Sequence, residues 1–169
     1  FIYKEQVSAG YINLNKEYKR LSVQMGLRLE HTGSNGHQLG NAMKPDSVFK
    51  RTYTNLFPTL YLLYKLDSAA DHQIGFNFGR RINRPYFQDL NPFISPLDKF
   101  TYYVGNPFLK PAFTNSLELS YTYKNRITVG FTYGRVRDEV NETIEIQHGT
   151  YYSRPGNLGS NTSISFTLD

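Results

Sequence analysis

The sequence predicts an all-β fold, an antiparallel up-and-down meander that forms part of a transmembrane β-barrel. The first reason is that apolar and polar residues alternate through long segments, as in residues 21–30 and 117–123. A period of two places apolar side chains on one face of a strand and polar side chains on the other. The second reason is that short and long connections alternate between these segments. The third is an aromatic content of 15%, with 14 Tyr and 12 Phe, which suits strands that end in interfacial girdles.

Seven segments carry the strand pattern. We expect strands near residues 5–14 and at about 20–31, 53–66, 72–82, 113–124, 126–139 and 160–168. The first is the least regular, because Tyr11 and Ile12 are adjacent apolar residues. In the third, Pro58 lacks the N–H that a ladder hydrogen bond needs, which predicts a bulge or irregular pairing. No segment predicts a helix.

The connections orient the expected barrel. Short turns are expected at 15–19, 68–71 and 124–126, and long loops at 32–52, 83–112 and 141–159. In outer-membrane barrels the short turns are periplasmic and the long loops extracellular. The longest loop contains five prolines, but also the aromatic residues Phe87, Phe93, Phe100, Tyr102 and Tyr103. Because disordered segments are poor in aromatic residues, we expect this loop to be ordered.

Composition limits the other possibilities. The mean hydropathy is −0.51, and no apolar run approaches the roughly 18 residues of a membrane helix. A barrel strand needs only about 9–11 residues, half of them polar. There is no Cys, so neither a disulfide nor a thiolate metal site is expected. The net charge of +5 is spread over turns and loops, so it suits anionic lipid headgroups or an acidic ligand, and we expect no nucleic-acid partner.

A soluble barrel or sandwich would also alternate apolar and polar residues. Three features favour the membrane: a polar face rich in Gly, Ser, Thr and Asn, strands longer than the usual 5–6 residues or so, and Tyr at the strand ends. We therefore expect the apolar face to meet lipid and the opposite face to line a water-filled lumen. The residues expected to face lipid are Leu21, Val23, Met25, Leu27, Leu29, Ile74, Phe76, Leu119, Val129 and Phe131.

Two segments resemble the signatures of a known family. The first is GRRINRPYFQDLNPF at residues 79–93, and the second is GNPFLKP at 105–111, followed by SLEL at 116–119. They are similar to a strand-to-loop passage and to the Asn-Pro-x-Leu-Lys-Pro-Glu stretch of TonB-dependent receptor-type outer-membrane β-barrels. Ala112 stands where that pattern usually has Glu.

The resemblance implies a 22-stranded barrel in the Gram-negative outer membrane, closed by a plug, that imports a scarce nutrient with energy relayed by TonB. The partners it implies are outer-membrane lipid and lipopolysaccharide, the rest of the barrel, its plug, TonB and an unknown nutrient. Residues 1–169 are expected to form a partial barrel domain without the plug, because seven strands cannot close. A non-transporting barrel for adhesion, secretion or structure is the alternative.

Ligand contacts are expected from the longest loop and the strand end before it. The candidate residues are Arg81, Arg84, Tyr86, Phe87, Asp89, Tyr102, Tyr103 and Asn106. Ordered aromatic residues above a barrel mouth suit recognition. Arg80, Arg81 and Arg84 lie where a strand leaves the membrane, where they can contact lipopolysaccharide phosphates or form salt bridges with Asp89 and Asp98.

No enzyme chemistry is expected, and neither a cofactor nor a metal. The plentiful Ser residues of the polar face have no matching His. His31 and His37 flank a Gly-rich stretch without a nearby carboxylate. The acidic run of Asp138, Glu139, Glu142 and Glu145 is better explained as solvated loop charge than as a cation site.

Overall fold

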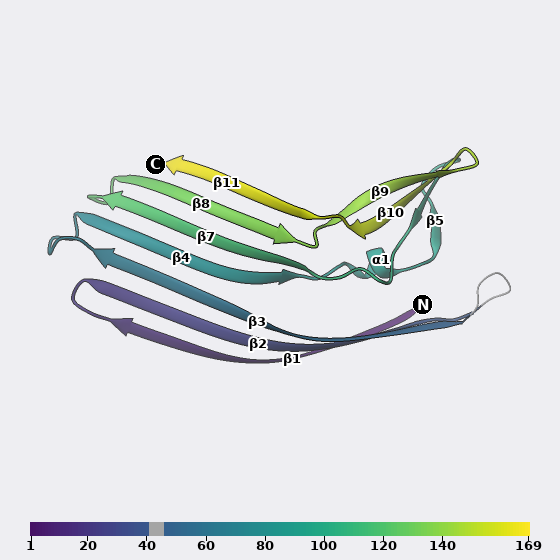
Figure 1. Cartoon of the computed structure of the whole chain (residues 1–169), viewed down its shortest axis with the longest axis horizontal. Coiled ribbons are helices and arrows are strands. Elements are labelled where there is room, and N and C mark those ends of the chain that lie inside the picture. Colours follow the sequence, from purple (N-terminus) through teal and green to yellow (C-terminus); the bar gives the residue numbers. More distant parts are fainter. Residues whose placement is uncertain (41–45) are drawn as a thin grey trace.

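The computed structural model describes residues 1–40 and 46–169, and its main element is a seven-stranded antiparallel sheet (Figure 1). The strands, in their order across the sheet, are β1 (Ile2–Glu17), β2 (Leu21–Gln38), β3 (Ser47–Lys65), β4 (His72–Asn83), β7 (Ala112–Tyr123), β8 (Ile127–Arg137) and β11 (Ser160–Leu168). Each strand pairs with the next strand of the meander, and β1 and β11 are the two edges. The predicted seven-stranded antiparallel meander is therefore confirmed.

The two longest connections form a second, smaller sheet at one end of the strands. Its order is β5 (Ile94–Pro96), β6 (Thr101–Val104), β10 (Thr150–Asn157) and β9 (Val140–Gln147). β6 and β10 pair in parallel over three residues, and the other two pairs are antiparallel. The one-turn helix α1 (Phe87–Leu90) lies at the same end (Figure 1). No helix in the described part of the chain is long and apolar enough to cross a membrane.

Two expectations about the loops were wrong. Residues 32–52 were expected to be a loop, but β2 continues to Gln38 and β3 begins at Ser47, and residues 141–159 contain the β9–β10 hairpin. The reason is that backbone pairing does not need an apolar face. β1, β2 and β3 stay in register from the apolar segment up to Ile2, His37 and Val48, where apolar and polar residues no longer alternate.

Register places the apolar residues of neighbouring strands side by side. One continuous row consists of Val23, Leu62, Phe76, Leu119, Phe131 and Phe166. Another consists of Met25, Leu60, Phe78, Leu117, Tyr133 and Ile164. Leu27 is 47% exposed. The buried apolar residues of the described structure are Phe57 and three residues at the loop end, Leu90, Leu109 and Ala112. Leu27 and Phe131 are therefore not packed together in a closed core. The apolar face is uncovered by protein, as the transmembrane interpretation requires; its contact with lipid stays a prediction.

The opposite face is built from glycine and small hydroxyl residues. Gly75 pairs with Ser120, Gly130 with Thr167 and Gly134 with Ser163. In each pair the hydroxyl oxygen lies within 2.6 Å of the place that a glycine Cβ would take. The side chains of these pairs are therefore short and polar, which suits the water-filled lumen predicted for this face.

Pairing between β3 and β4 is incomplete. β2 and β3 pair without interruption past Pro58, but the ladder between β3 and β4 ends at Thr59 and Gly79. Pro58 has no N–H to donate toward β4, so the irregular pairing that it predicts is found on this side. Beyond this point the sheet divides into the long β1–β3 part and the β4–β11 part, and the loop residues pack between them.

Candidate ligand-binding mouth

The segment GNPFLKP is the packing centre of the loop end. Leu109 is 1% exposed, and Leu90 of α1 and Ala112 are also buried. A Cβ on Gly105 would lie 2.3 Å from the Asn91 carbonyl oxygen, so only glycine allows this approach to the end of α1. The segment that carries the family resemblance therefore has a structural role here, which is to fold the longest loop onto α1.

Two asparagines join this loop to the β9–β10 hairpin. The side-chain amide of Asn106 donates to the Pro155 carbonyl at 3.3 Å, and its backbone N–H donates to the Asp89 carbonyl. The side-chain amide of Asn157 donates to the carbonyls of Lys110 and Asp138, at 2.9 and 2.7 Å. Asn106, predicted as a ligand contact, is thus occupied in holding the two loops together.

Arg84 attaches the same loop to the polar face of the sheet. Its Nη2 donates to Glu30 Oε2 at 2.6 Å, and its Nε lies 3.3 Å from Glu5 Oε1, in an ion pair without hydrogen-bond geometry. Glu30 is only 4% exposed and also pairs with Arg28 at 2.6 Å. Burial is the largest single influence and lowers the pKa of Arg84, but the interactions with Glu30 and Tyr53 together raise the pKa by more, so Arg84 stays charged. Arg84 therefore joins β1, β2 and the loop in one ion-pair network.

The expectation that the arginines form salt bridges with Asp89 and Asp98 was wrong. Asp89 accepts a hydrogen bond from the Tyr103 hydroxyl at 2.8 Å, and Asp98 accepts from the backbone N–H groups of Phe100 and Thr101, each at 2.8 Å. The Phe100 N–H is the main cause of a lowered pKa at Asp98. Burial first, and then the bond to Asp89, raise the pKa of Tyr103. Both carboxylates are used within the loop, so Arg84 finds its partners on the sheet.

Five aromatic rings gather at this end of the chain. They belong to Phe1, Tyr3, Phe49, Phe87 and Phe108. The Phe87 ring centroid lies 5.9 Å from that of Phe1, and the Phe108 centroid lies 6.2 Å from that of Phe49. Phe87 is 52% and Phe108 66% exposed, so the cluster presents ring surface to solvent. We call these five residues the aromatic cluster.

Sequence reasoning identified only Phe87 among these residues. Tyr3 and Phe49 both pair with Gly36 on β2, and a Cβ at Gly36 would lie 2.0 Å from the Phe49 ring. A glycine between two aromatic residues in adjacent strands is the signal that could have found them, but it becomes visible only once the register is known.

The other predicted residues lie apart from the cluster. Tyr86 is exposed, and Tyr102 stacks on Tyr152 of β10 with ring centroids 5.7 Å apart. Arg81 is exposed and forms no hydrogen bond or ion pair within the described residues. The structure therefore brings together Asp89, Tyr103 and Asn106, which hold the loop, and places Phe87 in the aromatic cluster.

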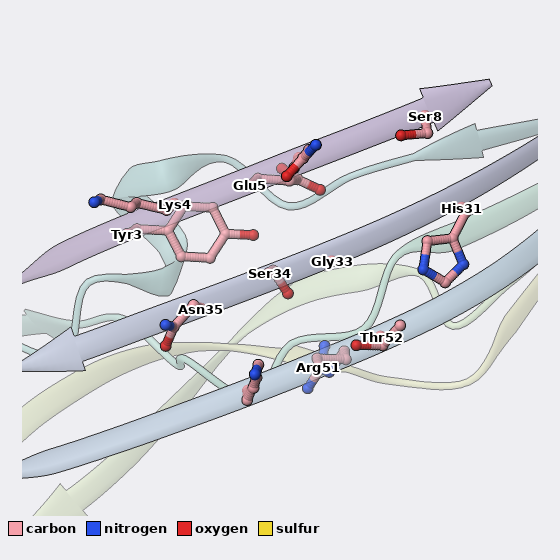
Figure 2. Close-up of a pocket in the computed structure, with 12 residues that line it drawn as sticks. Tyr3, Lys4, Glu5, Ser8, His31, Gly33, Ser34, Asn35, Arg51 and Thr52 are labelled. Atoms are coloured by element: carbon pink, nitrogen blue, oxygen red, sulfur yellow. The ribbon is translucent and has the colours of Figure 1, made fainter.

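A shallow polar cavity of about 800 Å³ lies on the parts of β1, β2 and β3 that extend beyond the β3–β4 ladder, and Tyr3 of the aromatic cluster is one of its lining residues (Figure 2). Its lining includes Tyr3, Glu5, His31, Lys50 and Arg51. Arg51 donates to the carbonyls of Phe108 and Leu109, so this part of the sheet is also attached to the loop. Lys50 and His31 continue the outward face of the sheet, whereas Tyr3, Glu5 and Arg51 lie on the inward face with the cluster. On that inward part, ring surface next to charged groups can bind a ligand with both apolar and polar parts.

Within residues 1–40 and 46–169, no three His, Asp or Glu side chains lie close enough to hold a metal ion. The acidic run near residue 140 is instead used in local contacts. The Ser153 hydroxyl donates to Glu142 at 2.9 Å, and Arg154 pairs with Glu145 at 3.5 Å.

Comparison with known proteins then identifies the family. The outer membrane protein beta-barrel family matches residues 1–169. The chain belongs to this family. Its location is accordingly the Gram-negative outer membrane. No protein with a curated functional description matches the sequence.

Solved structures of similar fold include three outer-membrane proteins. The hemophore receptor HasR of Serratia marcescens, in complex with its hemophore and heme, has a TM-score of 0.73 at 14% identity, with 97% of this chain and 31% of that chain covered. The copper transporter OprC has a TM-score of 0.67 at 15% identity, with 98% and 26% covered. The siderophore receptor PirA of Pseudomonas aeruginosa has a TM-score of 0.61 at 11% identity, with 98% and 39% covered.

These similarities confirm, at the level of the fold, the predicted resemblance to barrels of TonB-dependent receptors. The chain spans less than two fifths of the length of each of these three structures.

Proposed function

We propose that this chain is the part of an outer-membrane receptor barrel that binds and admits a scarce nutrient, with energy relayed by TonB. The observation that carries the proposal is that the long loops at one end of the strands, which we call the mouth, are ordered. These loops fold into a second sheet and a helical turn. Hydrogen bonds of Arg84 and Arg51 attach them to the main sheet. Preorganised loops on a rigid scaffold are typical of binding sites.

The aromatic cluster is the proposed contact surface for the ligand. Phe87 and Phe108 present half or more of their surface to solvent, while Tyr3 joins them to the polar cavity. Burying such rings against a ligand is strongly favourable, and they lose little conformational entropy on binding. Of the residues predicted from the sequence, Phe87 and Tyr86 remain the proposed contacts, and Asp89, Tyr103 and Asn106 become residues that position the loop.

The solved structures of similar fold support a receptor function, because they are named as a hemophore receptor, a copper transporter and a siderophore receptor. Their ligands differ chemically, so none is transferred to this chain. The proposed partners are lipid and lipopolysaccharide on the apolar face, the rest of the barrel, a plug and TonB. No catalytic role is proposed.

The test is growth of the parent bacterium with and without the gene, on media in which heme, copper or a ferric siderophore is limiting. We expect a growth defect under one limitation, shared with a strain that lacks TonB. The double variant Phe87→Ala/Phe108→Ala should reproduce the defect, while Phe93→Ala, a half-exposed ring of the same loop outside the cluster, should grow normally. Normal growth of the gene deletion in every medium would favour the non-transporting barrel.

A further inference from the structure

The two faces of the main sheet differ in the sign of their charges. The register assigns each charged side chain of the seven strands either to the outward face, which carries the apolar rows, or to the inward face. All four carboxylates of these strands lie on the inward face: Glu5, Glu17, Glu30 and Glu118. The outward face carries only cations: Lys4, Lys16, Lys50, Arg80, Arg135 and Arg137. A face with cations and no carboxylate is suited to an anionic surface.

Two of these cations follow the apolar residues of β8 directly. The outward residues of this strand are, in order, Ile127, Val129, Phe131, Tyr133, Arg135 and Arg137. A strand that rises about 3.3 Å per residue and tilts by about 40° gains about 5 Å along the membrane normal with every second residue. The two arginines therefore stand about 5 and 10 Å beyond Tyr133, in the headgroup layer next to the apolar belt.

The neighbouring strand adds hydroxyl groups to the same place. β8 and β11 lie side by side (Figure 1), and Arg135 pairs with Thr162 while Arg137 pairs with Ser160. All four side chains are exposed on the outward face. Neither arginine forms a hydrogen bond or an ion pair with any described residue. Guanidinium groups bind phosphate through paired, charge-assisted hydrogen bonds, and adjacent hydroxyl groups can donate to the same phosphate.

The arginines at the end of β4 are used differently, although the sequence suggested them for phosphate contacts. Arg84 is bound to Glu30, and Arg81 lies on the inward face. Arg80 is on the outward face, but its guanidinium lies over the Phe113 ring, 4.9 Å from the centroid, and its Nε is buried. The pair on β8 therefore offers the accessible guanidinium groups at this edge of the belt.

We propose that Arg135 and Arg137, together with the hydroxyl groups of Thr162 and Ser160, bind the phosphate groups of lipopolysaccharide at the outer edge of the membrane. The occupant is a lipid, because the site continues the apolar face: acyl chains can lie along Phe131 while the phosphates reach the arginines. The inference rests on the proposed function in one respect, that this face meets lipid and the loops are extracellular. It assigns residues to the proposed lipopolysaccharide contact.

The test is native mass spectrometry of the full-length protein, delipidated in detergent and titrated with bisphosphorylated lipid A, the phosphate-bearing anchor of lipopolysaccharide. A parallel titration uses the dephosphorylated lipid. We expect wild-type protein to bind the phosphorylated lipid at least tenfold more tightly. The double variant Arg135→Gln/Arg137→Gln should bind both lipids equally weakly. Arg135→Lys, which keeps the charge but loses the paired geometry, should weaken binding of the phosphorylated lipid several-fold.

Arg126→Gln is the matched control, since it removes the same charge from an exposed turn at the opposite end of the strands and should keep the wild-type preference. Each variant is checked for folding by its heat-dependent migration in gel electrophoresis. Equal binding of the two lipids by wild-type protein would overturn the proposal, and a protein segment that covers the arginines would give that result.

Equal loss of preference in Arg126→Gln would also overturn the proposal, because binding would then depend only on net charge. So would displacement of the lipid by an equal concentration of inorganic phosphate, since the site would then not distinguish a lipid from a solute. The titration needs neither TonB nor transport, so a negative result here is distinguishable from failure of the growth test of the proposed function.

Discussion

Replacing Glu30 by Gln tests whether the ion-pair network holds the mouth in place. Glu30 is almost fully buried and has a guanidinium contact of 2.6 Å from each of Arg28 and Arg84. Hydrogen bonds that involve charged groups contribute roughly 1.5–3 kcal/mol each, and breaking a buried pair costs about 3–5 kcal/mol. Arg28 is half-exposed, so its pair contributes little. We expect the free energy of opening the loop to fall by about 2–3 kcal/mol.

The assay is limited trypsin digestion of intact cells, because Lys99, which is followed by Phe100, is an exposed cleavage site in the loop. If local opening precedes cleavage, a loss of about 2–3 kcal/mol accelerates cutting on the order of 30- to 150-fold. Glu118→Gln is the control, since Glu118 lies on the same face, is exposed and has no ion pair in the described structure. Equal cleavage rates for Glu30→Gln and wild type would refute the idea that Arg84 and Glu30 attach the loop to the sheet.

Three further predictions concern other parts of the chain. Leu27→Arg should lower the free energy of unfolding into detergent by roughly 2–4 kcal/mol, whereas Gln24→Arg on the lumen face should cost much less, as urea titrations will show; equal costs would contradict the assignment of faces. Gly105→Ala should cost about 1–3 kcal/mol through overpacking against the backbone after α1 and increase tryptic cleavage of the loop; unchanged cleavage would argue against the tight approach. The pKa of Asp98 is lowered in the folded state, so this carboxylate stabilises the β5–β6 turn above the ordinary pKa of Asp, and the stabilisation is lost as the pH falls through the lowered value. Asp98→Asn should therefore remove this pH dependence from tryptic cleavage of the loop. If the pH dependence persists in the variant, another group causes it.

The main sheet could be predicted because its two faces differ along most of the length of its strands. Leu119 alternates with Glu118 and Ser120, and Phe131 with Gly130 and Thr132, so a shift of one residue would exchange the two faces. Alternation therefore defines both the strands and their lipid-facing parity. It does not define where strands end, since β2 and β3 continue to pair where apolar and polar residues no longer alternate.

The mouth could not be predicted to the same degree, because its contacts join residues far apart in the sequence. Asp89 lies five residues after Arg84, whereas the actual partner, Glu30, lies 54 residues before it. The choice depends on Asp89 being taken by Tyr103 and on β4 separating from β3. In the same way, Phe49 joins Phe108 only after the loop has folded back onto the sheet.

The central claim is that the face carrying Leu27 meets lipid and the opposite face lines the lumen. The chain has no Cys, so single cysteines can be introduced one at a time from residue 22 to residue 29 and spin-labelled in the full-length protein in bilayers. Collision rates with oxygen, which partitions into lipid, and with a water-soluble nickel chelate report the two environments. The account predicts high oxygen accessibility at 23, 25, 27 and 29, and high nickel accessibility at 22, 24, 26 and 28. Absence of this alternation, or its opposite phase, would contradict it.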